Sequence, residues 1–179
     1  MSKPFMFSAF NVTNQVFYQA KHSFAIVNLK PILPGHVLVL PRRVVPRLRD
    51  LSQEEIGDLF ESVKKVQSIL EKVYTATASN IGIQDGKDAG QTVPHLHVHL
   101  IPRKKLDFNE NDEVYQHLEK AEANLESLQA TGKEAIVGDQ APPTSMKKSI
   151  PRDEDRQPRT PEVMQEEATW LRSFFAQNQ

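Results

Sequence analysis

The chain has 179 residues, no cysteine and a formal net charge of −1. This length suits one domain with an appendage, and the lack of cysteine excludes disulfides, thiolate metal sites and thiol nucleophiles. There is no apolar run of about 20 residues for a membrane helix and no signal peptide pattern, and the near-neutral charge does not favour a general nucleic-acid binder. We expect a cytoplasmic protein, with the nucleus as a second location, and neither membrane nor nucleic acid as partner.

The charge and the prolines divide the chain into two unequal parts. Residues 1–102 carry 11 basic and 8 acidic residues, whereas residues 103–179 carry 11 basic and 15 acidic residues. Five of the twelve prolines lie between positions 142 and 161, in a stretch without hydrophobic periodicity. We therefore expect a compact domain over residues 1–124, a polar loop or disordered insertion over 125–160, and a C-terminal helix over 161–179 that packs on the domain.

The first third of the chain predicts antiparallel strands. Residues 5–7 and 14–19 are candidates for an opening hairpin, and residues 22–29 alternate in the manner of a strand, with Phe24, Ile26 and Asn28 on one face. A turn rich in proline and glycine separates this segment from an apolar strand over residues 36–40. Such a short link favours an antiparallel pair.

The clearest helix begins after Leu51, where Ser52 and Glu55 form a capping box. Seven apolar residues then follow helical spacing and form one stripe that can cover a sheet: Ile56, Leu59, Phe60, Val63, Val66, Leu70 and Val73. Residues 79–84 and 95–101 predict two further central strands, and residues 112–129 have some helical character. Thr160 and Pro161 are suited to begin the terminal helix, which we expect over residues 161–175.

Three of the six histidines alternate along the expected strand 95–101. Because strand side chains alternate between faces, His95, His97 and His99 line one face, and the apolar residues between them line the other. We expect the imidazoles on a solvated outer face, where they contribute little to a core. Clustered histidines of this kind indicate a functional site.

Two chemistries fit this row of histidines. It can ligate a metal, with Asp85 and Asp88 as further ligands, or it can attack phosphorus, since neutral imidazole is abundant at pH 7. The flanking loop combines glycines, which let backbone N–H groups approach an anion, with neutral hydrogen-bonding side chains at Gln84 and Gln91. These groups favour phosphate over a metal ion.

The histidine strand matches the His-φ-His-φ-His-φ-φ signature of the histidine triad superfamily, where φ is apolar. The wider stretches 83–94 and 101–103, together with 27–39 and 107–115, resemble its Fhit (fragile histidine triad) branch. The resemblance is close over residues 20–115 and looser in the terminal helix. It implies an α+β fold, with a five-stranded antiparallel sheet, one long covering helix and a C-terminal helix, and a homodimer whose sheets are continuous.

The resemblance also implies an activity and its catalytic groups. The activity is hydrolysis of diadenosine polyphosphates, with diadenosine triphosphate split into AMP and ADP through a nucleotidyl-histidine intermediate. His97 matches the nucleophile of the family, and His99 the histidine that contacts phosphate near the scissile bridge. His95 matches the residue that orients the nucleophile, and His36 a fourth histidine that supports the triad.

Further positions match the substrate-binding residues of the family. Asn28 matches a ribose contact, and Gln84 a contact to the phosphate chain. The phosphate-binding loop corresponds to Gly90, Gln91, Thr92 and Val93, and the apolar adenosine pocket to Phe24, Ile26 and Leu38. A divalent cation, Mg²⁺ or Mn²⁺, is expected to arrive on the polyphosphate, with no tightly bound metal in the protein.

Two alternative functions remain open from the sequence. One is nucleoside phosphoramidase activity, found in the same superfamily, although the Pro102-Arg103 continuation favours the Fhit branch. The other is a nucleotide-dependent signalling module whose bound state matters more than turnover. Neither the purpose of the 125–160 insertion nor the part played by Tyr115, in binding or in regulation, follows from the residues.

Overall fold

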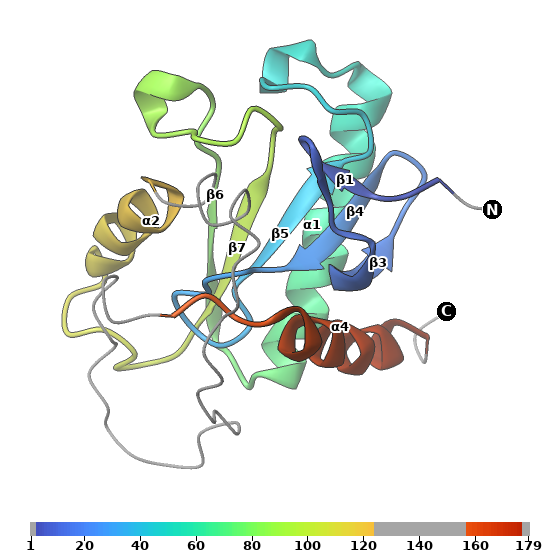
Figure 1. Cartoon of the computed structure of the whole chain (residues 1–179). Helices are drawn as coiled ribbons and strands as arrows, with labels where there is room; N and C mark the ends of the chain where they lie inside the picture. Colours follow the sequence, from blue (N-terminus) through green and yellow to red (C-terminus); the bar gives the residue numbers. More distant parts are fainter. Residues whose placement is uncertain (1–2, 124–156, 177–179) are drawn as a thin grey trace.

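A five-stranded antiparallel sheet forms the centre of the computed structural model, which describes residues 3–123 and 157–176 (Figure 1). Its strands lie in the order β3-β4-β5-β7-β6. Their bounds are β3 Val16–Gln19, β4 Ser23–Val27, β5 Val37–Pro41, β6 Ala78–Gly82 and β7 Val98–Arg103. The expected α+β fold with five antiparallel strands is confirmed.

The opening hairpin differs from the expected one. Strand β1 (Met6–Phe7) pairs with β2 (Phe10–Asn11), across a turn in which Ser8 has a φ of 54°. The segment 14–19 contributes β3 instead, which pairs with β4. The predicted pairing was wrong because the two-residue turn after Phe7 closes a tighter, more local hairpin.

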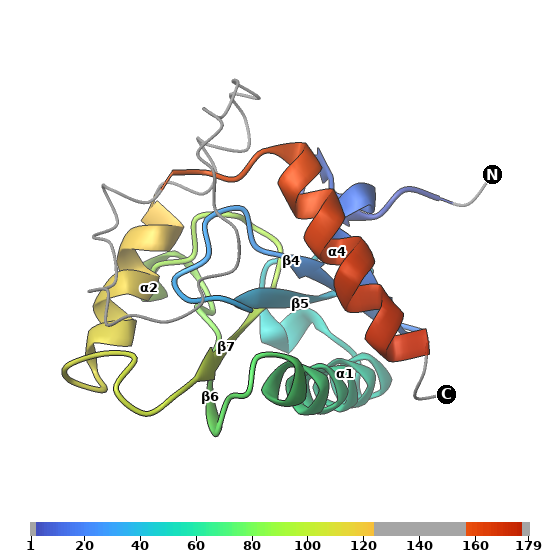
Figure 2. The same ribbon diagram turned by 90° about the horizontal axis from the view of Figure 1, so that it is seen from below.

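Helix α1 (Gln53–Val73) begins with the predicted capping box. The amide of Glu55 donates to the Ser52 Oγ atom at 3.2 Å, and the Glu55 carboxylate accepts from the Ser52 amide at 2.8 Å. Phe60 departs from the predicted stripe, with 42% of its surface exposed, because it lies one residue beyond the inward-facing Leu59 and so points away from the sheet. Figure 2 shows α1 covering one face of the sheet.

Two predicted strands are placed differently. The strand expected over 79–84 is β6, an outer strand of the sheet rather than a central one. The strand expected over 95–101 begins only at Val98, and the two histidines before it lie in irregular backbone. Helix α2 (Glu113–Ala123) follows the weak helical pattern, and the remaining residues expected in that helix lie outside the described part.

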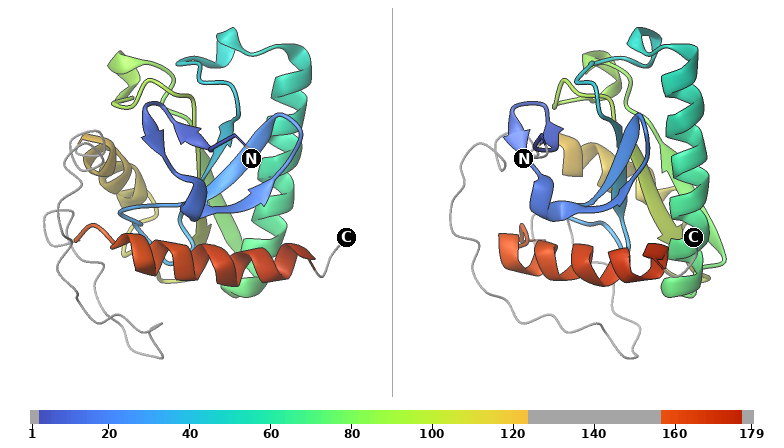
Figure 3. Two further views of the ribbon diagram at one scale, coloured as in Figure 1. Left: turned by 45° about the vertical axis from the view of Figure 1, so that its right-hand side comes forward. Right: turned by 90° about the vertical axis from the view of Figure 1, so that its right-hand side faces the viewer.

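The C-terminal helix α4 (Pro161–Ala176) crosses the sheet near one end of its strands (Figure 3). Thr160 caps it, because its Oγ1 atom accepts a hydrogen bond from the Val163 amide at 3.3 Å. Met164, Ala168 and Leu171 are buried in the same core cluster as the inner face of α1. Of the expected polar insertion, only residues 157–160 lie within the described part.

The two faces of the sheet carry separate apolar clusters. On β4, Ala25 and Val27 face α1, whereas Phe24 and Ile26 face the hairpin β1–β2. This alternation agrees with the strand pattern predicted from the sequence. Among the helices that the structure describes, none has the length and apolar character to cross a membrane.

Candidate active site

The three alternating histidines are buried rather than solvated. The exposed fractions of His95, His97 and His99 are 0%, 2% and 2%. The expected solvated face was wrong because the hairpin β1–β2 packs over it, with the Phe7 ring centroid 5.8 Å from that of His95 and 5.2 Å from that of His97. The first ten residues contain no motif from which this cover could be predicted.

Backbone groups hold both nitrogens of His95. The amide of Ser8 donates to Nδ1 at 3.1 Å, so Nε2 carries the proton and donates to the Pro41 carbonyl at 2.9 Å. Burial lowers the pKa of His95 to about 4, against the opposing effect of the Pro41 carbonyl. The His95 ring is therefore neutral near pH 7 and links the hairpin to the end of β5.

The main chain of His95 fixes the tautomer of His97. The His97 Nδ1 atom lies 2.7 Å from the His95 carbonyl oxygen. Because a carbonyl only accepts, Nδ1 donates, and the neutral ring keeps its lone pair on Nε2. Phe7 and His99 pack edge-on against this ring, with the His99 centroid at 5.0 Å. His97 is thereby held in the tautomer required of a nucleophile.

A second tautomer is fixed through His36. The Ile32 amide donates to the His36 Nδ1 atom at 3.1 Å, so Nε2 carries the proton of the neutral ring. That atom lies 3.0 Å from the Nδ1 atom of His99 and donates to it. In neutral His99 the proton then sits on Nε2, so this nitrogen can donate to a phosphate or to a leaving oxygen.

Asn28 lies beside this pair of histidines. Its Oδ1 atom accepts from the Lys30 amide at 3.0 Å, which directs Nδ2 toward the His36 Nε2 atom at 3.2 Å. With the His36 tautomer above, both groups are donors, so we interpret this as packing rather than as a hydrogen bond. The predicted ribose contact thus lies against the supporting histidine in this structure.

The loop after β6 holds the predicted phosphate contacts. Gln84 is 8% exposed, and its buried Oε1 atom has no hydrogen-bond partner among the described residues. Gly90 has a φ of 91°, and a Cβ atom there would lie 2.9 Å from the Gln84 Nε2 atom. A buried amide oxygen without a partner is costly, which is typical of a binding site rather than of a core.

A cavity of about 800 Å³ adjoins this loop. Arg47 and Lys87 contribute cationic groups to its lining, and Gly90, Gln91 and Thr92 contribute the predicted loop. Arg47 also pairs with Asp85 at 3.2 Å. The Leu48 amide, followed by Arg47, lowers the pKa of Asp85 below its ordinary value. Arg47 was not among the predicted site residues, because its pairing with Asp85 depends on the fold.

The predicted adenosine-pocket residues come together on the histidine side of the sheet. Leu38 pairs with His99 across β5 and β7, and Ile26 pairs with Leu38. Phe24 completes the group, and the Phe5 ring lies 4.9 Å from it. Val93 packs in the same buried cluster, so only its backbone can belong to a phosphate loop.

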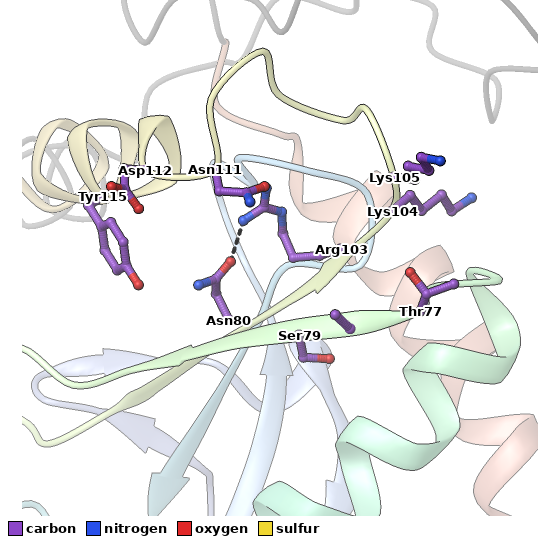
Figure 4. A pocket seen from close by; sticks show the side chains of 10 residues that line it. Thr77, Ser79, Asn80, Arg103, Lys104, Lys105, Asn111, Asp112 and Tyr115 are labelled. Carbon is purple, nitrogen blue, oxygen red and sulfur yellow. Dashed lines mark hydrogen bonds between the residues drawn. The ribbon is translucent and has the colours of Figure 1, made fainter.

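A second cavity, of about 390 Å³, lies at the β6 edge, apart from the histidines (Figure 4). Arg103 donates to Asn80 and forms an ion pair with Asp107 at 2.7 Å. Tyr115 lines this cavity and is exposed. The candidate chemistry depends on the histidine tautomers described above. None of those histidines lines this edge cavity.

The chain is similar to known proteins of one family. The HIT domain model matches residues 9–106, which include all four histidines of the site. A Schizosaccharomyces pombe protein named bis(5'-nucleosyl)-tetraphosphatase [asymmetrical] is 64% identical over 100% of this chain and 98% of its own length. A Dictyostelium discoideum bis(5'-adenosyl)-triphosphatase is 39% identical over 92% and 88%. The structure of Plasmodium falciparum diadenosine triphosphate hydrolase matches with a TM-score of 0.68 and 28% identity, over 99% and 87% of the two chains.

Proposed function

The chain belongs to the histidine triad (HIT) family, and from this premise we propose that it hydrolyses dinucleoside polyphosphates, with diadenosine polyphosphates as substrates. One observation carries the proposal. The hydrogen bond from His97 Nδ1 to the His95 carbonyl, at 2.7 Å, leaves the lone pair of the neutral ring on Nε2, next to a second histidine that carries a proton.

The reaction divides into two displacements at the α-phosphorus. In the first, His97 Nε2 forms a bond to phosphorus, and the bond to the bridging oxygen breaks. As the nucleotide departs with its negative charge, His99 Nε2–H donates a hydrogen bond to the leaving oxygen, and the His36 contact has placed this proton on Nε2. In the second, water attacks the phosphorus, the bond from phosphorus to His97 Nε2 breaks, and the proton of water is released with AMP, which restores His97.

The loop residues support binding of the phosphate chain. The unpartnered Gln84 oxygen requires a donor or a cation from the substrate, and Arg47 and Lys87 line the cavity that adjoins this loop, together with the acidic Glu119. The described residues contain no group of three or more metal-binding side chains. We propose that Mg²⁺ or Mn²⁺ enters on the polyphosphate, because this ion prefers phosphate oxygens and water to a cage of protein ligands.

The length of the phosphate chain is the finer part of the proposal. The resemblance to the Fhit branch implies diadenosine triphosphate as the preferred substrate, but the residues themselves do not determine the preference. The names of the relatives include both a triphosphatase and an asymmetrical tetraphosphatase. Attack at the α-phosphorus gives AMP from either compound, with ADP or ATP as the second product. Only the ratio of kcat/KM values between the two substrates decides the preference.

Hydrolysis in ¹⁸O-labelled water tests the proposal. We expect the label in AMP and none in ADP or ATP, because water attacks the nucleotidyl-histidine. Label in the second product would overturn attack at the α-phosphorus. Adenosine phosphoramidate assayed alongside separates the phosphoramidase alternative, which predicts the higher kcat/KM for the P–N substrate.

We also propose a homodimer joined through the outer strand β6. Among the described residues this strand has a sheet neighbour on one side only, so its other edge can pair with a second copy. Light scattering during size-exclusion chromatography is expected to give twice the 20.3 kDa chain mass. A monomer at micromolar concentration would overturn the proposed homodimer and leave the proposed hydrolase activity unaffected.

A further inference from the structure

The segment that carries His36 is held from the side opposite the histidines. It runs from Asn28 to His36, and the His36 side chain contacts the row of three histidines through its hydrogen bond to His99. This segment lies between β4 and β5 and has few backbone hydrogen bonds of regular secondary structure, although the His36 amide donates to the Leu33 carbonyl at 3.0 Å. Its position therefore depends on contacts from other elements.

Arg159, just before α4, provides one of these contacts. Its backbone amide donates to the Leu29 carbonyl at 2.9 Å. Its guanidinium donates twice to the Asn28 carbonyl, from Nε at 3.0 Å and from Nη2. The remaining Nη1 group forms an ion pair with Glu167 of α4, and both side chains are largely buried. Three hydrogen bonds from one residue thus fix the backbone at the start of the segment.

Tyr74 provides a contact at the other end of the segment. A Cβ atom on Gly35 would lie 2.7 Å from the Tyr74 ring, so the ring packs directly against the glycine that precedes His36. The Tyr74 hydroxyl donates to Glu167 at 2.9 Å, and burial, followed by Glu167, raises the pKa of the phenol. Glu167 therefore joins the two contacts, one at Asn28 and one at Gly35.

We propose that Arg159 is a positioning residue for the reaction, acting through the Asn28 backbone to keep the His36 ring in register with His99. The inference rests on the proposed function, in which the His36–His99 pair supplies the hydrogen bond that stabilises the departing nucleotide. It assigns the chain just before α4 a part in catalysis and not only in stability. A displacement of a catalytic group by about 1 Å can cost up to about a hundredfold in rate.

A matched pair of variants separates positioning from stability. Arg172 of α4 also donates to a backbone carbonyl, that of Val16, which lies at the start of β3 and away from His36. We expect Arg159→Ala to lower kcat about tenfold with KM changed less than twofold, and Arg172→Ala to lower the melting temperature while kcat is retained. Arg159→Lys, which keeps one donor for the carbonyl, is expected to give an intermediate kcat.

A readout without substrate completes the test. In ¹⁵N-edited NMR of the full chain, we expect wild-type and Arg172→Ala protein to show His36 protonated on Nε2, and the Arg159 variants to show this tautomer lost or exchanging. Equal kcat losses in the two alanine variants, or an unchanged His36 signal in both Arg159 variants, would overturn the proposal. The NMR result does not need turnover, so it remains decisive even if the proposed hydrolase activity is wrong. If Arg159→Ala does not fold, kcat and the His36 NMR signal are both measured on Arg159→Lys.

Discussion

The Nε2 atom of His36 lies 3.0 Å from the Nδ1 atom of His99, and the amide that binds the far side of the His36 ring determines which of the two carries the proton. The direction of the bond, from His36 to His99, places a proton on the outer nitrogen of His99. Stabilisation of the departing nucleotide therefore depends on a residue that does not touch the substrate's phosphorus.

Replacing His36 with Asn is expected to slow the first displacement, because the shorter side chain cannot reach both the Ile32 amide and His99. We expect kcat for diadenosine triphosphate to fall by about 10²-fold, in line with loss of a hydrogen bond to the leaving oxygen. An AMP aryl ester with a good leaving group depends less on this hydrogen bond and is expected to be hydrolysed almost as by wild type. Equal losses for both substrates would contradict the role of His36 in stabilising the leaving group, and His22→Asn, away from the site, serves as the control.

Replacing His97 with Asn removes the nucleophile while preserving a polar side chain of smaller size. We expect kcat to fall by at least about 10³-fold and the Kd of a non-hydrolysable analogue, measured by calorimetry, to change little. Trapping with labelled substrate followed by acid precipitation is expected to label wild type and not the variant. Full turnover in the variant would remove His97 from the role of nucleophile.

The fold followed from local patterns where these patterns were strong. The capping box at Ser52 and the alternation around Phe24 predicted α1 and β4 because each depends on residues close in sequence. The order of strands depends on contacts between distant segments, so the outer position of β6 could not be derived from residues 78–82. Phe60 was misplaced because it lies at one border of the apolar stripe of α1, and the sequence does not show which border of the stripe the sheet covers.

The sequence indicated candidate members of the site but not their surroundings. The alternation of His95, His97 and His99 indicated a functional cluster, yet their burial depends on a hairpin without any motif. The contacts of Arg159 with Asn28 span 131 positions, and no local pattern marks them. The residues proposed to do chemistry carried a sequence signal, whereas those proposed to hold them in place did not.

His95 predicts a pH dependence of stability. Its folded-state pKa of about 4 lies below the ordinary 6.5, so the unfolded chain binds a proton between these values that the native ring does not. Its contribution is fully present above pH 6.5 and decreases as the pH falls toward 4, with a limiting slope of about 1.4 kcal/mol per pH unit. Urea unfolding of wild type and His95→Gln across this range checks the slope. Parallel curves for the two proteins would contradict the shift.

Gly90 is expected to tolerate no side chain. Its φ of 91° costs an L-residue about 1–2 kcal/mol, and a Cβ atom would lie 2.9 Å from the Gln84 amide. We expect Gly90→Ala to raise KM several-fold and to lower the free energy of unfolding. Gly57→Ala is the control, since nothing lies within 4 Å of its Cβ position in α1, and we expect it to stabilise the protein by about 0.5–1 kcal/mol. An unchanged KM for Gly90→Ala would show that the Gln84 amide does not contact substrate.

Phe7 packs against the nucleophile and is expected to limit the motion of its ring. The edge-on contact at 5.2 Å from His97 is contributed by a hairpin residue that is itself fully buried. Phe7→Leu is expected to cost about 1–2 kcal/mol of stability through lost packing and also to lower kcat several-fold, because a mobile imidazole spends less time in line with phosphorus. Phe17→Leu, in the cluster on the α1 side, is the matched control, with a similar loss of stability and unchanged kcat. If both variants retain wild-type kcat after correction for the folded fraction, Phe7 acts only in packing, and the bond from His97 Nδ1 to the His95 carbonyl is sufficient to hold the ring.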